Sequence, residues 1–551
     1  MTADLVLLDG NVLTMAGEVE PAQAVAVRQG RIVAVGTSGS VRDLVTPATE
    51  VVQLAGRTVL PGIHDGHIHM ADWSRQLPQF SVDVTSATRL DEVVRAVGER
   101  VATAGPGSWI RGHGWYEGRI AEFAGGRMPT RHDLDAVSPH NPVVLGHFSE
   151  HGVWANSAAL ELAGVTARTP DPEGGTISRD PAGEPTGWLI ESAGALVLSV
   201  LPAMSKQERI QSLVTGMAEL NRRGVTSVTD PMVSAELARL YQELAASDLQ
   251  SLRVSMLMHW AGLGRPNSAA EIERALAYSG VSTGLGDEWL RVAGAKLFID
   301  GIPALRTAWL SRPYADGCTG SLVTDGDSDT DRYGEVMEMI RLLHGARLQA
   351  QVHATGDRAC DSAVDGFIRA MQDDPWPEAR HALIHANLLT AQTAQKMAQY
   401  GFCVNLNSLI KWNVGDRLAG LYGDERAGYT MPMRTLIDAG LHVADTSDAP
   451  VVDPDWRQAV HCMVARQTRG SGKVSGPEQR VSRMEALRGW TIEAAYQEHT
   501  DHLKGSIEVG KFADFVVLEQ DPLAVPESEL PELSVAMTYV DGQCEYHVDE
   551  S

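Results

Sequence analysis

Both ends of the chain carry short apolar runs that are separated by polar turn residues. Runs of this kind occupy residues 5–8, 24–27, 32–35, 515–518 and 535–540. The first run leads into Asp9-Gly10 and the last into Asp541-Gly542, which are hairpin turn signals. We therefore expect one small β-sandwich domain built from both termini, residues 1–57 and 503–551.

Between these ends, longer apolar runs alternate with stretches of helical periodicity. The strand candidates are residues 58–69, 225–230, 253–258, 291–299, 348–353, 382–386, 401–406 and 441–447. Helical stretches such as 207–222 and 391–399 fall between most of them. Eight strands in alternation with helices predict an α/β fold, a (β/α)8 barrel of the TIM type. Residues 142–145 also have strand character, but we leave them out of the barrel because they lie between its first two strands.

The stretch from residue 70 to residue 203 is far too long for a βα connection. We interpret it as an insertion subdomain after barrel strand 1 that would act as a substrate lid. The barrel itself then comprises residues 58–69 and 204–502. This division accounts for the length of 551 residues, which at roughly 150 residues per domain suggests three or four domains.

Composition narrows the class of protein. The net charge of −25 argues against sequence-independent binding of nucleic acid, which needs basic patches. Five scattered cysteines without a C-x-x-C pair exclude a disulfide scaffold and a cysteine-based zinc module. There is no apolar run of about 18 residues and no basic, signal-like N-terminus. We therefore expect a soluble, cytoplasmic protein with no membrane partner.

The strongest local signal for chemistry is the pair His67 and His69 at the end of the first barrel candidate. Residues i and i+2 of a strand point to the same face, so the two imidazoles would converge on one metal ion. Such a pair is weak on its own among 18 histidines, and two surface histidines are an equal alternative.

Four further residues strengthen the metal hypothesis because they occupy equivalent places in other strands. Lys296 lies inside an apolar strand, where a lysine must be ion-paired, snorkelling or chemically modified. His353, His385 and Asp448 lie at or just beyond three other strand ends. The C-terminal strand ends of a barrel form its catalytic face, so these side chains are expected to meet there.

Several motifs give the chain a family resemblance. They are the P-G-x-x-D-x-H-x-H stretch at 61–69, residues 154–160, 296–301, 306–308 and 351–357, Ser447-Asp448-Ala449-Pro450-Val451, and the tail 505–514. In these segments the sequence resembles the amidohydrolase superfamily, and within it the YtcJ-like branch that includes N-substituted formamide deformylases.

The resemblance implies two divalent metal ions, with zinc favoured by the ligand types. His67, His69 and Asp448 would bind the first metal, and His353 and His385 the second. Lys296 would carry a carbamate formed from CO2 that bridges the two. The implied function is hydrolysis of an N-substituted amide or formamide by a metal-activated bridging hydroxide, with Asp448 as the catalytic proton acceptor and donor.

Departures from the branch put the substrate in doubt rather than the reaction type. They fall at Ser149-Glu150-His151, at Leu406-Asn407 and at Thr446-Ser447-Asp448. Candidate substrate-binding residues are Trp115, His151, Trp154 and Arg306, although ordinary packing or a salt bridge explains each of them about equally well.

Alternative functions remain open at this point. A carbamate, ester or cyclic-amide hydrolase would use the same site, and a deaminase or an inactive scaffold is more distant. The partner we expect is a small-molecule substrate, and a homodimer stays open.

Overall fold

The computed structural model describes residues 2–17, 22–123, 126–148, 151–261 and 267–548, which form two compact units. One unit comprises Met1–Met70 and Met217–Ser551, and the other comprises Ala71–Gly216. The chain passes between them within α2 (Met70–Gln76) and α7 (Lys206–Arg222). Within the described residues, none of the helices combines the length and apolar character needed to cross a membrane.

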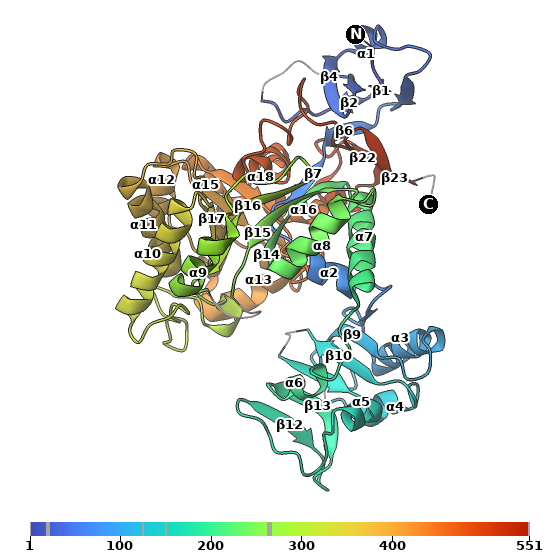
Figure 1. The fold of residues 1–551 in the computed structure, drawn as a ribbon, viewed down its shortest axis with the longest axis vertical. Coiled ribbons are helices and arrows are strands. Elements are labelled where there is room, and N and C mark those ends of the chain that lie inside the picture. Colours follow the sequence, from blue (N-terminus) through green and yellow to red (C-terminus); the bar gives the residue numbers. More distant parts are fainter. Residues whose placement is uncertain (1, 18–21, 124–125, 149–150, 262–266, 549–551) are drawn as a thin grey trace. The chain divides into compact units, whose positions relative to one another are not determined.

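The larger unit contains an eight-stranded parallel sheet (Figure 1). Its strands follow chain order and are β7 (Ile63–Asp65), β14 (Val225–Val233), β15 (Arg253–Met258), β16 (Leu290–Phe298), β17 (Ala350–Ala354), β18 (Ala382–His385), β19 (Cys403–Leu406) and β20 (His442–Asp445). Each strand pairs with the next, which gives seven of the eight ladders of a closed barrel among the described residues. The first and last strands, β7 and β20, are joined by backbone hydrogen bonds between the segments that follow them. This confirms the expected (β/α)8 architecture.

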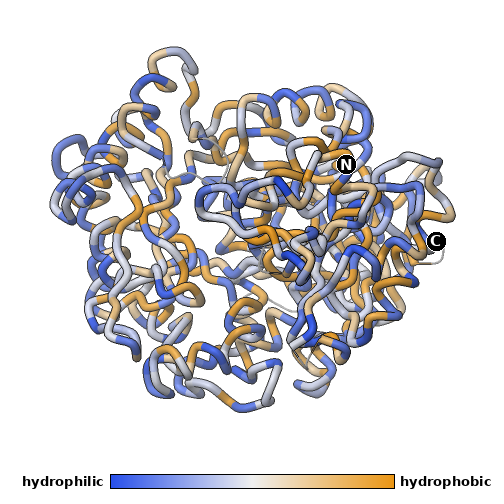
Figure 2. Tube along the Cα trace, turned by 90° about the horizontal axis from the view of Figure 1, so that it is seen from below, coloured by the Kyte–Doolittle hydropathy of each residue, from blue (hydrophilic) through white to orange (hydrophobic). Residues whose placement is uncertain are grey.

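Helices alternate with these strands, as the sequence pattern predicts. They are α8 (Ala235–Ala245), α9 (Ala269–Ser279), α10 (Asp329–Gly345), α11 (Asp357–Asp373), α12 (Ala391–Gln399), α13 (Ser408–Tyr422), α14 (Asp424–Tyr429), α15 (Met433–Asp438), α16 (Trp456–Ala465), α17 (Arg483–Gly489) and α18 (Ile492–Gln497). Many begin at a capping side chain, as at Ser268, which accepts from the backbone of Glu271. Apolar and hydrophilic stretches are interspersed along the described part of the trace (Figure 2).

The two chain ends form two further sheets in the same unit. One has the order β4-β3-β1-β5 and the other β2-β6-β21-β22-β23. Their strands are β1 (Leu5–Leu8), β2 (Asn11–Val12), β3 (Ala24–Arg28), β4 (Arg31–Gly36), β5 (Glu50–Gln53), β6 (Thr58–Pro61), β21 (Phe515–Leu518), β22 (Val535–Val540) and β23 (Gln543–His547). Buried residues of both sheets, such as Leu7, Val25 and Phe515, share one core, as a β-sandwich requires.

The expected first barrel strand, 58–69, is two strands in two different sheets. Residues 58–61 form β6, which pairs with β21 of the sandwich, and only 63–65 pair with β14 of the barrel. The break falls at Gly62, where a Cβ would lie 2.1 Å from Thr226 Oγ1, so only glycine fits this crossing point.

The smaller unit is built around a sheet of order β12-β13-β11-β10-β9-β8. Its elements are β8 (Val82–Asp83), α3 (Leu90–Thr103), β9 (Ile110–Trp115), α4 (Arg131–Asp135), β10 (Val143–His147), β11 (Gly152–Ala155), α5 (Ser157–Leu162), β12 (Gly175–Arg179), β13 (Pro185–Glu191) and α6 (Gly194–Leu198). The strand character noted at 142–145 belongs to β10. The bounds of this unit, Ala71–Gly216, begin one residue after those expected for the insertion, 70–203, and end thirteen residues later.

Candidate metal centre

His67, His69 and Asp448 form a compact cluster of potential metal ligands. Oδ1 of Asp448 lies 3.5 Å from Nε2 of His67 and 3.4 Å from Nε2 of His69. One ligand atom from each residue lies within 4.8 Å of the other two. Two imidazoles and a carboxylate at this spacing are a suitable donor set for a divalent ion such as zinc.

The backbone explains why these three residues meet. Both histidines lie beyond β7, outside any strand, so the strand alternation invoked from the sequence is not what aligns them. The Asp448 N–H instead donates to the His67 carbonyl at 2.9 Å, and the His69 N–H donates to the Ala449 carbonyl at 2.9 Å. These reciprocal bonds join the segments that follow the first and last barrel strands.

Lys296 brings an amine to the same place from the barrel wall. Its side chain is fully buried in β16, and Nζ lies 3.2 Å from Nε2 of His67 and 4.8 Å from the centre of the Phe298 ring. Burial lowers the pKa of this amine to about 7, although the carboxylate of Asp448 opposes the shift. A neutral amine has a free lone pair and reacts with electrophiles, whereas an ammonium group does not.

His353 and His385 form the other side of the cluster, with ring centres 4.5 Å apart. The Nδ1 of His385 lies 2.6 Å from the side-chain oxygen of Asn407, and the Nε2 of His353 lies 3.2 Å from the Gly301 carbonyl. Each ring therefore donates through one nitrogen and keeps the other free for a metal. Burial lowers the pKa of both imidazoles, that of His385 to about 4, so both are neutral as metal binding requires.

A buried chain of hydrogen bonds connects His385 to the segment that carries the first two histidines. Asn407 donates to Thr446 Oγ1 at 3.0 Å, and Thr446 donates to Asn405 at 2.8 Å. Asn405 in turn donates to the Gly66 carbonyl at 3.1 Å, next to His67. Asn407, which departs from the family pattern, thus fixes the orientation of one predicted ligand and ties it to the other side of the barrel.

Two of the predicted ligands have left-handed backbone conformations, with φ of 71° at His385 and 59° at Asp448. Non-glycine residues in this region cost about 1–3 kcal/mol each, and such strain is concentrated at functional sites. The carboxyl pKa of Asp448 is below its ordinary value: burial raises it, but the hydrogen bond with His69 and the adjacent His385 and Lys296 outweigh that effect.

The five histidine and lysine side chains and Asp448 line a cavity of about 380 Å³. The rest of its wall is largely apolar, and its apolar residues are Met232, Phe298, Ile302, Pro303, Ala304, Ile410, Val414, Leu418, Met431 and Val451. A volume of this size suits a small organic molecule. The wall therefore favours a substrate with an uncharged, apolar group beside the bond that reacts.

Each predicted substrate-binding residue has a contact within its own unit. Arg306 pairs with Asp316 at 2.6 Å and is half-exposed, although residues 302–304 just before it line the cavity. In the smaller unit, Trp115 and Trp154 are fully buried in its core, with ring centres 5.7 Å apart, while the exposed His151 lies 3.0 Å from Glu191. Ser149 and Glu150 lie outside the described residues.

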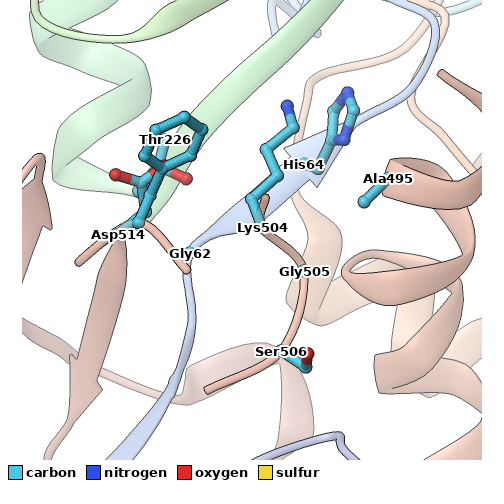
Figure 3. Close-up of a pocket in the computed structure, with 9 residues that line it drawn as sticks. Gly62, His64, Thr226, Ala495, Lys504, Gly505, Ser506 and Asp514 are labelled. Atoms are coloured by element: carbon cyan, nitrogen blue, oxygen red, sulfur yellow. The ribbon is translucent and has the colours of Figure 1, made fainter. Parts of the chain in front are cut away.

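A second, much smaller cavity of about 10 Å³ lies in the larger unit (Figure 3). His64 and Lys504 line it, and both contact the buried carboxylate of Glu498, at 3.2 and 3.8 Å. Its volume fits about one water molecule. Lys504 offsets the charge of Glu498, so we assign the cluster to the packing of the barrel interior.

Sequence reasoning did not single out His259, which lies at the catalytic end of the barrel. His259 directly follows β15 and is 5% exposed. The rule that found His353 and His385, a histidine where an apolar strand ends, applies to it equally.

The chain is similar to proteins of known family. The model of the amidohydrolase family matches residues 50–546. The N-substituted formamide deformylase of Arthrobacter pascens is 30% identical over 98% of both chains, and the Bacillus subtilis protein YtcJ is 29% identical over 98% of both. A metal-dependent hydrolase of Pyrococcus furiosus has the same fold, with a TM-score of 0.74, 24% identity and coverage of 94% of this chain and 99% of its own.

Proposed function

The chain belongs to the amidohydrolase family and is a metal-dependent hydrolase, and from this premise we propose that it cleaves the C–N bond of an N-substituted amide or formamide. The observation that carries the proposal is the convergence of His67, His69 and Asp448 with Lys296 in the wall of a largely apolar cavity. The 30% identical deformylase supports a linear amide as the substrate.

We assign the ligands to two metal ions according to which side chains lie together. His67, His69 and Asp448 would hold one divalent ion, and His353 and His385 the other, with zinc favoured by nitrogen and oxygen donors. When bound, the ions would polarise a carbonyl group and lower the pKa of a water molecule. The arrangement fits because the imidazoles of the second pair are neutral, and each is oriented through one nitrogen.

Lys296 completes the set in its carboxylated form. Its neutral nitrogen forms a bond to the carbon of CO2, one C–O π pair moves to oxygen, and the nitrogen releases a proton to water. The product is a monoanionic carbamate with two donor oxygens. Carboxylation is consistent with an amine that is fully buried 3.2 Å from His67 and has no carboxylate within salt-bridge distance among the described residues.

Residues of the chain itself transfer the proton and bind the substrate. Asp448 is the carboxylate that accepts a proton from the attacking water and passes it to the leaving amine, which departs poorly without one. The apolar wall, including Phe298 and Leu418, holds the substituent and excludes bulk water.

Metal analysis together with a substrate panel tests this function. We expect about two divalent ions per chain and turnover of N-substituted formamides or amides, with carbamates and esters as comparison substrates. Lys296→Ala should abolish turnover and lower the metal content. Lys504→Met serves as the matched control, because Lys504 is another buried lysine outside the cavity and its loss should leave both metals bound. Full amide turnover by metal-free protein would overturn the proposal.

A further inference from the structure

His259 is a buried imidazole at the catalytic end of the barrel that has no part in the ligand set above. It follows β15, and its backbone N–H donates to the Val233 carbonyl at 3.1 Å. Met258, the last residue of β15, is paired with Ala295 in the ladder between β15 and β16, so His259 follows directly after the partner of the residue that precedes Lys296. Such strands lie about 4.8 Å apart.

The side chain of His259 is on the same side of the sheet as that of Lys296. Its ring packs edge-on against the Phe298 ring, with centres 5.8 Å apart, and the Lys296 amine lies over the same Phe298 ring at 4.8 Å. The imidazole also interacts electrostatically with Lys296 and His69. His259 therefore packs in the immediate surroundings of the lysine.

Among the described residues, neither ring nitrogen of His259 has a hydrogen-bond partner. The ring lies near the backbone of Lys296, but outside hydrogen-bond geometry. A buried polar group without a partner costs about 1–3 kcal/mol, so such groups are usually hydrogen-bonded to protein, to ordered water or to a bound group. Both ring nitrogens of His259 are therefore available to hydrogen-bond to a further group beside Lys296.

The position of His259 favours Lys296 over the substrate as the source of that group. With 5% of its surface exposed, His259 is not among the residues that line the cavity, whereas Lys296 is. A molecule in the cavity would meet the wall residues first. Nζ of Lys296 and the ring of His259 both lie against the Phe298 ring, so atoms added to the lysine nitrogen would lie beside the imidazole.

We propose that His259 is a positioning residue whose imidazole N–H donates a hydrogen bond to the carboxylated side chain of Lys296, and that it thereby stabilises this modification. The inference rests on the proposed function, because it assumes the carbamate. A buried anion needs donors to replace its lost water, and charge-assisted hydrogen bonds are the strongest available. The other imidazoles around Lys296 are assigned to the metals, which leaves His259 for this bond.

The test follows the carbamate itself rather than turnover. Full-length protein freed of metal and CO2 is titrated with ¹³C-labelled bicarbonate and zinc, and the carbamate carbon is observed by NMR. The variants are His259→Phe, which keeps a ring against Phe298 but has no donor, and His259→Asn, which keeps one N–H donor. Met258→Leu is the matched control, because it alters the adjacent buried side chain and leaves every imidazole in place.

We expect His259→Phe to need at least about ten times more CO2 for half-maximal carbamate, since a hydrogen bond to a charged group contributes at least that factor. His259→Asn and Met258→Leu should stay near the wild-type value. Equal CO2 dependence of the wild type and His259→Phe, or an equal defect in Met258→Leu, overturns the role of His259 and leaves the proposed function standing. If His259→Phe does not fold, a wild-type response from His259→Asn supports the donor role and a tenfold loss refutes it. A wild type without any carbamate signal overturns the carbamate and this inference together.

Discussion

Replacing Asn407 by leucine should weaken the second metal site without removing a metal ligand. The substitution keeps the approximate volume but deletes the oxygen that lies 2.6 Å from Nδ1 of His385. It also deletes the amide group that donates to Thr446. Partners of this kind fix the tautomer of a ligating histidine, and losing one typically costs a factor of 10–100 in metal affinity or activity, or about 1.4–2.7 kcal/mol.

The assay is a titration of apoprotein with zinc in competition with a chromophoric chelator. We expect Asn407→Leu to bind one equivalent with wild-type affinity, through His67, His69 and Asp448, and the second equivalent at least tenfold more weakly. Asn407→Asp is the matched control, because it keeps an acceptor at the same atom and should keep both equivalents. If Asn407→Leu binds the second equivalent as tightly as the wild type, the hydrogen bond does not orient His385 and the assignment of this pair fails.

Three further outcomes follow from groups described above or buried elsewhere in the larger unit. The Arg253 guanidinium makes two bonds to the buried Asp514 carboxylate, at 2.8 and 3.0 Å, so Asp514→Leu should lower the free energy of unfolding by about 3–5 kcal/mol. The double variant Arg253→Met/Asp514→Leu should recover most of that loss in urea denaturation, and equal losses would contradict this. Burial, with a smaller contribution from His344, lowers the pKa of His381 to about 3, so between about pH 6.5 and pH 3 the unfolded chain binds a proton that the folded chain does not. Stability should therefore fall as the pH falls through this range, by at most about 1.4 kcal/mol per pH unit from this group, and His381→Gln should flatten that slope in pH-dependent denaturation. Ala304→Phe, which narrows the cavity, should raise KM for bulky apolar amides at least tenfold and leave metal content unchanged; an equal effect on the smallest formamide would show that Ala304 does not contact the substituent.

Much of the barrel is predictable from sequence because its strands are buried on both faces and read as continuous apolar runs. The helix at 391–399 has the expected bounds, and strand 253–258 matches β15 exactly in extent. The run at 58–69 shows the limit. Apolar character records that a segment is buried, but not which sheet buries it, so the change of sheet at Gly62 is invisible without the position of Thr226.

The candidate site was also predictable only in part. Ligand candidates could be predicted because strand ends meet at one face of a barrel, and this holds for His353 and His385. The groups that orient them could not, because Asn407 acts through hydrogen bonds to residues distant in the chain. The tryptophans of the insertion illustrate the opposite problem: aromatic residues suit both a binding surface and a core, and Trp115 and Trp154 lie in a core.

The sandwich has a consequence for the order in which the protein is made. β6 pairs with β21, so Val59 meets Val517 across nearly the whole length of the chain. At roughly 5–20 residues per second, a ribosome needs on the order of half a minute to a minute and a half between these two strands. During that time the apolar edge of β6 has no partner strand from the C-terminal segment, while the barrel strands that follow it can already pair with one another in chain order. The newly made strands β2 and β6 therefore depend on protection from aggregation until β21 is synthesised, whereas the sheet β4-β3-β1-β5 can form from N-terminal residues alone.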